Sequence, residues 1–274
     1  MAAEKAGAVT DGTPNTIQWF PGHMVTALRK LQEWLALVDV VIEVVDARLP
    51  LMSANPDLDR VIGTRPRLVI LGRDDLADPF ATRRWLAWYR TQGIHAFAVD
   101  GRQQPSVNRA RVEFNKFLEG RAHARAMVVG IPNTGKSSLI NALLKRTAAK
   151  TENKAGVTRQ LRWFRVSSSL ELMDTPGILV PKIPTAEAQW MLAITGALPR
   201  ERYDAEDVTA RFAAWAHANR PHLDVPDLEA FARGRGFVRK GDAVDLHNAA
   251  GAYLRAFGDG KFGRVTFEEP PEAA

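Results

Sequence analysis

Residues 130–137 read Gly-Ile-Pro-Asn-Thr-Gly-Lys-Ser, the complete pattern of a phosphate-binding loop. In this pattern the backbone N–H groups wrap a polyphosphate, Lys136 reaches its β and γ oxygens, and the Ser137 hydroxyl ligates Mg²⁺. The pattern needs a strand before it and a helix after it. An apolar run at 126–129 predicts the buried strand, and 138–144 have a helical pattern. The sequence therefore predicts a nucleoside triphosphate bound at a helix N-terminus. The expected contacts are Asn133, Thr134, Gly135, Lys136, Ser137 and Ser138.

A second phosphate-site motif follows at 170–177, Leu-Glu-Leu-Met-Asp-Thr-Pro-Gly. An apolar strand delivers Asp174 to the Mg²⁺ shell, and Gly177 lets its backbone N–H approach the γ-phosphate. Between the two motifs, Thr158 lies in a polar segment suited to a switch and can complete the shell. The expected metal ligands are therefore Ser137, Thr158 and Asp174.

The base-reading motif of a GTPase, Asn/Thr-Lys-x-Asp, has its best match upstream of the phosphate loop. The downstream match at 239–242 follows a segment too short and too rich in glycine for a buried parallel strand. Upstream, the apolar run 67–71 leads into Gly-Arg-Asp-Asp at 72–75. Runs at 38–45 and 95–100 predict two further strands ahead of the phosphate loop. This order predicts an α/β fold with a mostly parallel sheet, that of a circularly permuted GTPase, and a permutation is tolerable because chain termini tend to lie close together.

Composition indicates a globular protein with a polyanionic partner. The chain of 274 residues is 46% hydrophobic and 25% charged and contains no cysteine, which excludes disulfides and thiolate metal sites. The net charge is +6. Residues 181–274 hold 12 Lys and Arg against 14 Asp and Glu, so the positive excess falls in residues 1–180. A surface that meets RNA and an ordinary solvated face both remain open. No apolar stretch is long enough for a membrane span, and 1–16 are expected to be a short disordered leader.

Taken together, the motifs resemble the YlqF/RbgA family of circularly permuted GTPases, which act in assembly of the large ribosomal subunit. The resemblance spans residues 17–270. Besides the phosphate loop, it rests on Trp-Phe-Pro-Gly-His-Met at 19–24, Val-Asp-Ala-Arg-Leu-Pro at 45–50, Asp-Thr-Pro-Gly-Ile-Leu at 174–179 and Lys-Phe-Gly-Arg at 261–264. It implies hydrolysis of GTP to GDP, slow alone and stimulated by the ribosomal particle, and a helical C-terminal domain that contacts rRNA.

The resemblance also implies a catalytic residue. Ile178 occupies the position where many GTPases place a glutamine that orients the attacking water. Similar proteins use the histidine of the 19–24 segment instead, which is His23 here. Asn133 matches a position that helps to bind K⁺ in related potassium-stimulated GTPases, against the alternative of a loop-stabilising asparagine.

The base-reading motif departs from the family pattern, because Gly72 replaces its asparagine. Asp75 can still accept from guanine N1–H and the 2-amino group, and Arg73 can cover the base face. Losing one neutral hydrogen bond costs about 0.5–1.5 kcal/mol, so we expect GTP preference with weaker affinity, and tighter GDP binding in Gly72→Asn.

After residue 180 the chain is expected to be helical, at 185–194, 205–218 and 244–257. We assign 1–180 to the GTPase domain and 181–274 to a helical, RNA-contacting domain, with Trp190 and Trp215 in packing positions. Three functions remain: a slow GTPase switch for large-subunit assembly, a nucleotide-gated RNA-binding assembly factor with marginal hydrolysis and relaxed base specificity, and a P-loop ATPase or kinase. We expect a cytoplasmic monomer with no membrane partner.

Overall fold

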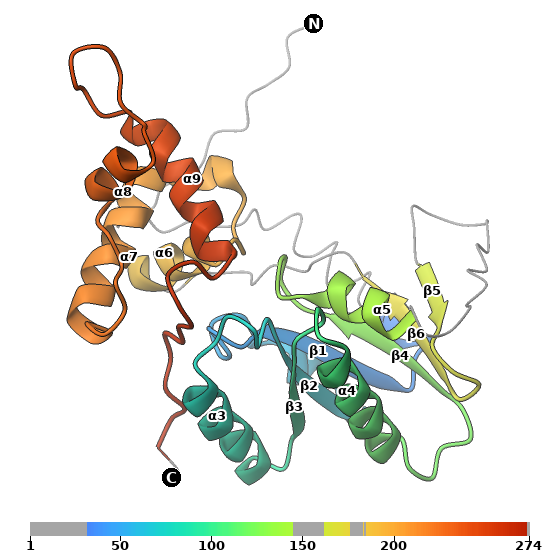
Figure 1. Ribbon diagram of the computed structural model, residues 1–274. Helices are drawn as coiled ribbons and strands as arrows, with labels where there is room; N and C mark the ends of the chain where they lie inside the picture. The colour runs from blue at the N-terminus through green and yellow to red at the C-terminus, as the bar shows by residue number, and fades with distance from the viewer. Residues whose placement is uncertain (1–31, 145–161, 176–182, 184, 273–274) are drawn as a thin grey trace, which may run out of the picture.

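The computed structural model describes residues 32–144, 162–175, 183 and 185–272. They form a layered α/β part from β1 to β6 and a helical part from α6 to α9 (Figure 1). After α9 the chain runs back along the α/β part, past α3 (Figure 1).

The α/β part is built on one six-stranded sheet with the order β3-β2-β1-β4-β6-β5. Neighbouring strands are parallel except β5, which pairs antiparallel with β6. The strands are β1 Val40–Asp46, β2 Arg67–Gly72, β3 His95–Val99, β4 Ala124–Val129, β5 Arg162–Arg165 and β6 Leu170–Asp174. The predicted mostly parallel sheet is confirmed.

Helices cover both faces of this sheet. Ile42 and Val44 of β1 belong to the core beneath α4 and α5, whereas Val41 and Val45 belong to the cores on the opposite face with α2 and α3. These helices are α2 Leu58–Ile62, α3 Pro79–Thr91, α4 Gln104–Phe117 and α5 Lys136–Leu144. Because successive side chains of a strand point to opposite faces, a strand covered on both sides must be apolar throughout. β1 and β2 accordingly read as apolar runs, and the buried Glu43 that interrupts β1 is paired with Arg67 of β2.

The strand order shows the permutation directly. β4, which leads into the phosphate loop, lies centrally between β1 and β6, although three strands precede it in the chain. Starting at β4, the chain order becomes β4, β5, β6, β1, β2, β3. This places the phosphate loop first, Asp174 next and the base-reading loop later, as in an unpermuted GTPase. The carboxyl ends of the parallel strands β1, β2, β3, β4 and β6 bring all three motifs to one edge of the sheet.

The helical part has an aromatic core. The rings of Phe212 and Phe257 meet edge to face at 4.8 Å, and Tyr253 and Phe262 lie 4.6 Å apart. The elements are α6 Ala186–Ile194, the 3-10 helix η1 Arg200–Arg202, α7 Ala205–Asn219, α8 Leu228–Gly234 and α9 Leu246–Gly258. The three expected helices correspond to α6, α7 and α9. None of the helices in the described ranges is long and apolar enough to cross a membrane.

Residues 259–269, called here the return segment, connect the helical part to the α/β part. The ring of Phe267 lies 4.7 Å from that of Trp215 and 5.7 Å from that of Trp190, so both tryptophans have the packing role predicted for them. Further along, the Trp85 indole in α3 donates to the Glu268 carbonyl at 3.1 Å. The segment therefore packs on both parts at once.

Candidate nucleotide-binding site

A cleft opens where the carboxyl ends of β2 and β3 meet the phosphate loop and the start of α5. Its lining comprises Gly72, Arg73, Asp75, Val99, Asp100, Gly101, Arg102, Asn133, Gly135, Lys136, Ser137, Ser138 and Leu139. The two loops that the sequence analysis singled out, from distant parts of the chain, therefore share one cleft. Thr134 is buried beneath it, and its hydroxyl donates to the Ile131 carbonyl at 3.2 Å.

The phosphate loop is shaped by glycine and by a left-handed asparagine. Gly130 has φ 147° and Gly135 has φ 100°, and Asn133 adopts φ 64°. A β-carbon at residue 130 would lie 2.3 Å from the Val44 carbonyl oxygen in β1, so only glycine fits there. α5 begins at Lys136, which places its unpaired N–H groups at the cleft.

Lys136 lies buried within the loop. Its ammonium donates to the carbonyls of Gly130 and Ile131 at 3.0 and 2.6 Å. Burial lowers the Lys136 pKa to about 8, and the negative charge of Asp174 opposes that shift. The lysine is thus held beside the cleft together with an acidic partner from β6.

Asp174 ends β6 at the same edge of the sheet. Its register partner in β4 is Val128, and the next residue, Thr175, donates its hydroxyl to the Val128 carbonyl at 2.7 Å. Ser137 is exposed in the first turn of α5. Thr158, Gly177 and His23 lie outside the described residues.

Gly72 brings the base-reading loop into direct contact with the phosphate loop. A β-carbon at residue 72 would lie 2.1 Å from the Thr134 carbonyl oxygen and 3.2 Å from Val44 Cγ1. Separations below about 3 Å require backbone movement here, because the nearest atom is a main-chain oxygen. The glycine that breaks the family pattern is therefore a packing requirement of this chain.

Asp75 is flanked by two arginines. Its carboxylate lies 3.4 Å from Arg102 Nη1 and 4.0 Å from Arg73 Nε. Arg102 follows β3, where the Asp100 carboxylate accepts from the Arg102 N–H at 2.8 Å. Arg102 was not predicted from the sequence as a site residue. The available signal was its place after an apolar strand that ends at the same edge as the base-reading loop.

Comparison with known proteins shows the family to which this chain belongs. Ribosome biogenesis GTPase A of Priestia megaterium is 39% identical over 283 residues, which cover 94% of this chain and 98% of that protein. The protein of the same description from Thermotoga maritima is 31% identical, with 93% and 95% covered. The chain belongs to the ribosome biogenesis GTPase A family. Residues 125–212 also match the family model described as 50S ribosome-binding GTPase.

The solved structures agree with the family fold. A GNP-bound crystal structure of YlqF from T. maritima aligns with a TM-score of 0.70 at 29% identity, covering 90% of this chain and all of that one. A GDP-bound YlqF structure aligns with a TM-score of 0.69 at 30% identity, covering 88% and 99%. The resemblance, the permuted α/β fold and the GTPase class stated from sequence are therefore confirmed.

In this member of the ribosome biogenesis GTPase A family, the helical part touches the nucleotide loops. The Asn133 side-chain amide donates to the Gly196 carbonyl, just after α6, at 2.6 Å. The Arg73 guanidinium donates to the Gly258 carbonyl at the end of α9 at 2.9 Å. Burial lowers the Arg73 pKa, and the nearby positive charge of Arg48 acts in the same direction. The stem of Arg73 remains on the cleft side, near Gly135.

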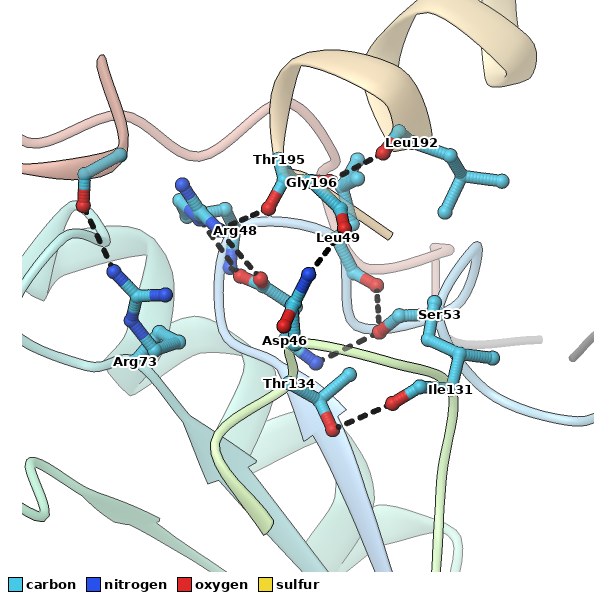
Figure 2. Close-up of polar contacts among 12 residues, drawn as sticks. Asp46, Arg48, Leu49, Ser53, Arg73, Ile131, Thr134, Leu192, Thr195 and Gly196 are labelled. Carbon is cyan, nitrogen blue, oxygen red and sulfur yellow. Dashed lines mark hydrogen bonds and ion pairs between the residues drawn. The ribbon is translucent and has the colours of Figure 1, made fainter. Parts of the chain in front are cut away.

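A buried ion pair lies behind the phosphate loop (Figure 2). Arg48 donates to the Asp46 carboxylate through Nε at 2.9 Å and Nη2 at 2.7 Å. Nη2 also contacts the Thr195 carbonyl at 3.3 Å, and the guanidinium lies over the Phe257 ring. Asp46 and Arg48 come from the 45–50 motif that the family resemblance rested on. In the structure they join the end of β1 to the helical part.

Proposed function

We propose that this protein binds GTP, hydrolyses it to GDP and phosphate slowly alone and faster on a large ribosomal subunit or its precursor, and assists assembly of that particle. The observation that carries the proposal is that the phosphate loop and Asp75 line one cleft. A phosphate loop alone serves any nucleoside triphosphate. A carboxylate at the base end favours guanine, which offers the N1–H and 2-amino donors that adenine lacks. The descriptions of the relatives support the ribosomal partner.

Phosphate and metal binding follow from the chemistry of the cleft. Lys136 and the N–H groups of residues 133–138 would hold the phosphates. The Ser137 hydroxyl and the Asp174 carboxylate are hard oxygen donors at one edge of the sheet, which suits Mg²⁺. Thr158 would complete the Mg²⁺ shell, and the Gly177 N–H would meet the γ-phosphate. The ion would stabilise the charge that develops on the transferred phosphoryl group.

The base would be recognised by Asp75 and Arg73. Asp75 accepts from guanine, and the Arg73 stem covers the base while its guanidinium remains near Gly258. Hydrogen bonds to a charged acceptor are worth about 1.5–3 kcal/mol. The binding free energy that Asp75 contributes to guanine selection is therefore larger than the binding free energy lost with the asparagine.

His23 would orient the attacking water. The support is the family resemblance of residues 19–24 and the aliphatic Ile178, which cannot hydrogen-bond water. Positioning dominates phosphoryl transfer, so an imidazole need not be a strong base.

A potassium ion would bind beside the phosphates with the Asn133 carbonyl among its ligands. The Asn133 amide nitrogen donates to Gly196, which leaves the side-chain oxygen as the free acceptor of that group. This arrangement supports a K⁺ ligand, and the alternative is a loop-stabilising asparagine.

Residues 1–180 would act as the GTPase domain, and 181–274 as the domain that contacts rRNA in a nucleotide-dependent way, with release on hydrolysis. The positive excess in residues 1–180 would add non-specific attraction to the rRNA backbone. We propose that the protein acts as a monomer in the cytoplasm.

A second candidate is a nucleotide-gated RNA-binding assembly factor with marginal hydrolysis and relaxed base specificity. Gly72 favours it, because the packing against Thr134 leaves no room for the asparagine of the family motif.

The deciding experiment measures hydrolysis of GTP and ATP by the purified protein in KCl, with and without large ribosomal subunits. GTP-specific turnover that rises with subunits supports the GTPase. Binding to subunits without turnover of either nucleotide would favour the second candidate, and equal turnover of ATP would contradict guanine selection.

A further inference from the structure

Residues 260–266 of the return segment contact Asp74 in the base-reading loop and residues 76–78 directly after it. The Val265 N–H donates to the Leu76 carbonyl at 2.9 Å, and the Thr266 hydroxyl accepts from the Asp78 N–H at 3.0 Å. A β-carbon at Gly260 would lie 2.8 Å from a Leu76 methyl group, so the backbone approaches closely there. These contacts join residues separated by more than 180 positions in the chain.

The Arg264 side chain adds two further hydrogen bonds to this contact. Its Nε donates to the Ala77 carbonyl at 2.7 Å, and its Nη2 donates to the Asp74 carbonyl. Asp75 lies between these two carbonyls in the chain. A single guanidinium with a rigid planar fork therefore holds the backbone on both sides of the carboxylate that faces the cleft.

The loop has a particular need for such support. The family motif places an asparagine at the position of Gly72, and a glycine supplies no side-chain contact to neighbouring loops. The direction of the Asp75 carboxylate then depends on the backbone of residues 73–77, together with its ion pairs to Arg102 and Arg73. In the described residues Arg264, Val265 and the packing of Gly72 on Thr134 support this backbone, in addition to the hydrogen bond from the Leu76 N–H to the Arg73 carbonyl.

We propose that Arg264 is a positioning residue for guanine recognition, which sets the direction of Asp75 through the Asp74 and Ala77 carbonyls. The inference rests on the proposed function, because it requires guanine to bind at Asp75. It gives a role to the Lys-Phe-Gly-Arg motif at 261–264, which the nucleotide cleft alone does not use. Arg264 itself does not line the cleft.

The test compares GDP with IDP, whose base lacks only the 2-amino group. Affinities are measured for the wild type, Arg264→Ala, Arg264→Lys and Arg84→Ala. Arg84 is the matched control, since it forms a bidentate pair with Glu269 in the same return segment but contacts no residue of the loop in the structure. Thermal unfolding of each variant reports on folding.

In Arg264→Ala we expect GDP affinity to fall about three- to tenfold, because a misdirected Asp75 loses part of its charge-assisted hydrogen bonding to guanine. IDP affinity, which depends on one fewer of these bonds, should change less. The ratio of the two affinities should therefore drop. Arg264→Lys keeps a cation that reaches one of the two carbonyls and should give an intermediate ratio. If the alanine variant does not fold, the lysine variant alone tests the inference. Arg84→Ala should keep the wild-type ratio.

An unchanged ratio in both Arg264 variants overturns the inference alone. If GDP and IDP affinity then fall by the same factor, the result indicates general loosening of the cleft. As a further check, Arg264→Ala should add no loss of GDP affinity to Asp75→Ala. An additional loss there would mean that Arg264 acts elsewhere. A wild-type protein that does not prefer GDP over ADP would instead overturn the proposed function.

Discussion

Gly72 and Thr134 bring the base-reading and phosphate loops into close contact, with the Thr134 carbonyl oxygen only 2.1 Å from the position of a β-carbon at residue 72. The sequence alone favours restoring asparagine at this position to tighten GDP binding. The structure reverses that expectation, because the side chain would displace the phosphate loop.

We therefore predict that Gly72→Ala and Gly72→Asn both weaken GDP binding. Overpacking of a close contact typically costs about 1–3 kcal/mol, and here the displaced atoms belong to the loop that holds the phosphates. Calorimetric titration with GDP measures the effect. Gly234→Ala is the control, since nothing lies within 4 Å of its β-carbon position. Tighter GDP binding by Gly72→Asn would contradict the packing argument.

Asp75→Asn should change the preferred base of the bound nucleotide from guanine to xanthine. An amide donates to the xanthine 2-carbonyl but no longer accepts two hydrogen bonds from guanine. Losing bonds to a charged acceptor costs about 1.5–3 kcal/mol, or roughly tenfold to a hundredfold in GDP affinity. Competition between GDP and XDP measures the exchange. An unchanged GDP preference would place the base away from Asp75.

His23→Ala should leave GDP affinity close to wild type and lower the rate of GTP hydrolysis on large ribosomal subunits. A side chain that positions the attacking water raises the rate of the chemical step but does not contribute to nucleotide binding in the ground state. Single-turnover hydrolysis with saturating subunits separates the two effects. An unchanged rate would remove His23 from the mechanism.

The Asp46–Arg48 pair predicts a large loss of stability in Arg48→Ala. Side-chain exposures of 5% for Asp46 and 1% for Arg48 make this a buried pair, and removing one partner of such a pair typically costs about 3–5 kcal/mol. Arg211→Ala breaks the exposed Arg211–Asp207 pair and should change stability by less than about 1 kcal/mol. Urea unfolding of both variants provides the comparison, and equal effects would argue against the burial-based explanation.

Glu268 predicts a pH dependence of stability. Burial raises its pKa to about 7, although the backbone N–H groups of Leu51 and Met52 donate to the carboxylate at 2.9 and 3.0 Å. Between its unfolded value of 4.5 and about 7, the folded state binds more protons, so this group lowers stability as pH rises through that window, by up to about 3 kcal/mol. Above about pH 7 the contribution is constant.

Glu268→Gln should remove that contribution. The difference in unfolding free energy between wild type and variant is measured from pH 5 to 8, so that titration of other carboxylates cancels. A constant difference over this range would show that Glu268 titrates normally.

Much of the fold was predictable from local patterns. β1, β2 and β4 are covered on both faces and read as apolar runs, and α6, α7 and α9 each present apolar residues at helical spacing. β5 was not predicted, because an antiparallel edge strand of four residues, Arg-Trp-Phe-Arg, is too short to show a recognisable hydrophobic pattern. α3 also carried a usable signal in Asp78 and Pro79, an N-cap followed by proline at the first helical position.

The site was predictable only where the chemistry is local. The phosphate loop is eight consecutive residues, and Asp75 follows a recognisable strand. Arg102 acquires its place from the neighbouring positions of β2 and β3, and the fit of Gly72 against Thr134 depends on how two loops meet in space. Arg264 reaches Asp74 from 190 positions away, and no periodicity or spacing signals such a contact.

The return segment has a consequence for biosynthesis. Leu76 is hydrogen-bonded to Val265, and Trp85 is hydrogen-bonded to Glu268. The part of the sheet next to the base-reading loop therefore depends on residues that are translated long after its own strands. A nascent chain that has exposed all six strands still lacks the segment that closes this loop. The nucleotide site can therefore be completed only late in synthesis of the chain. Contacts between residues so far apart in sequence also favour slow folding.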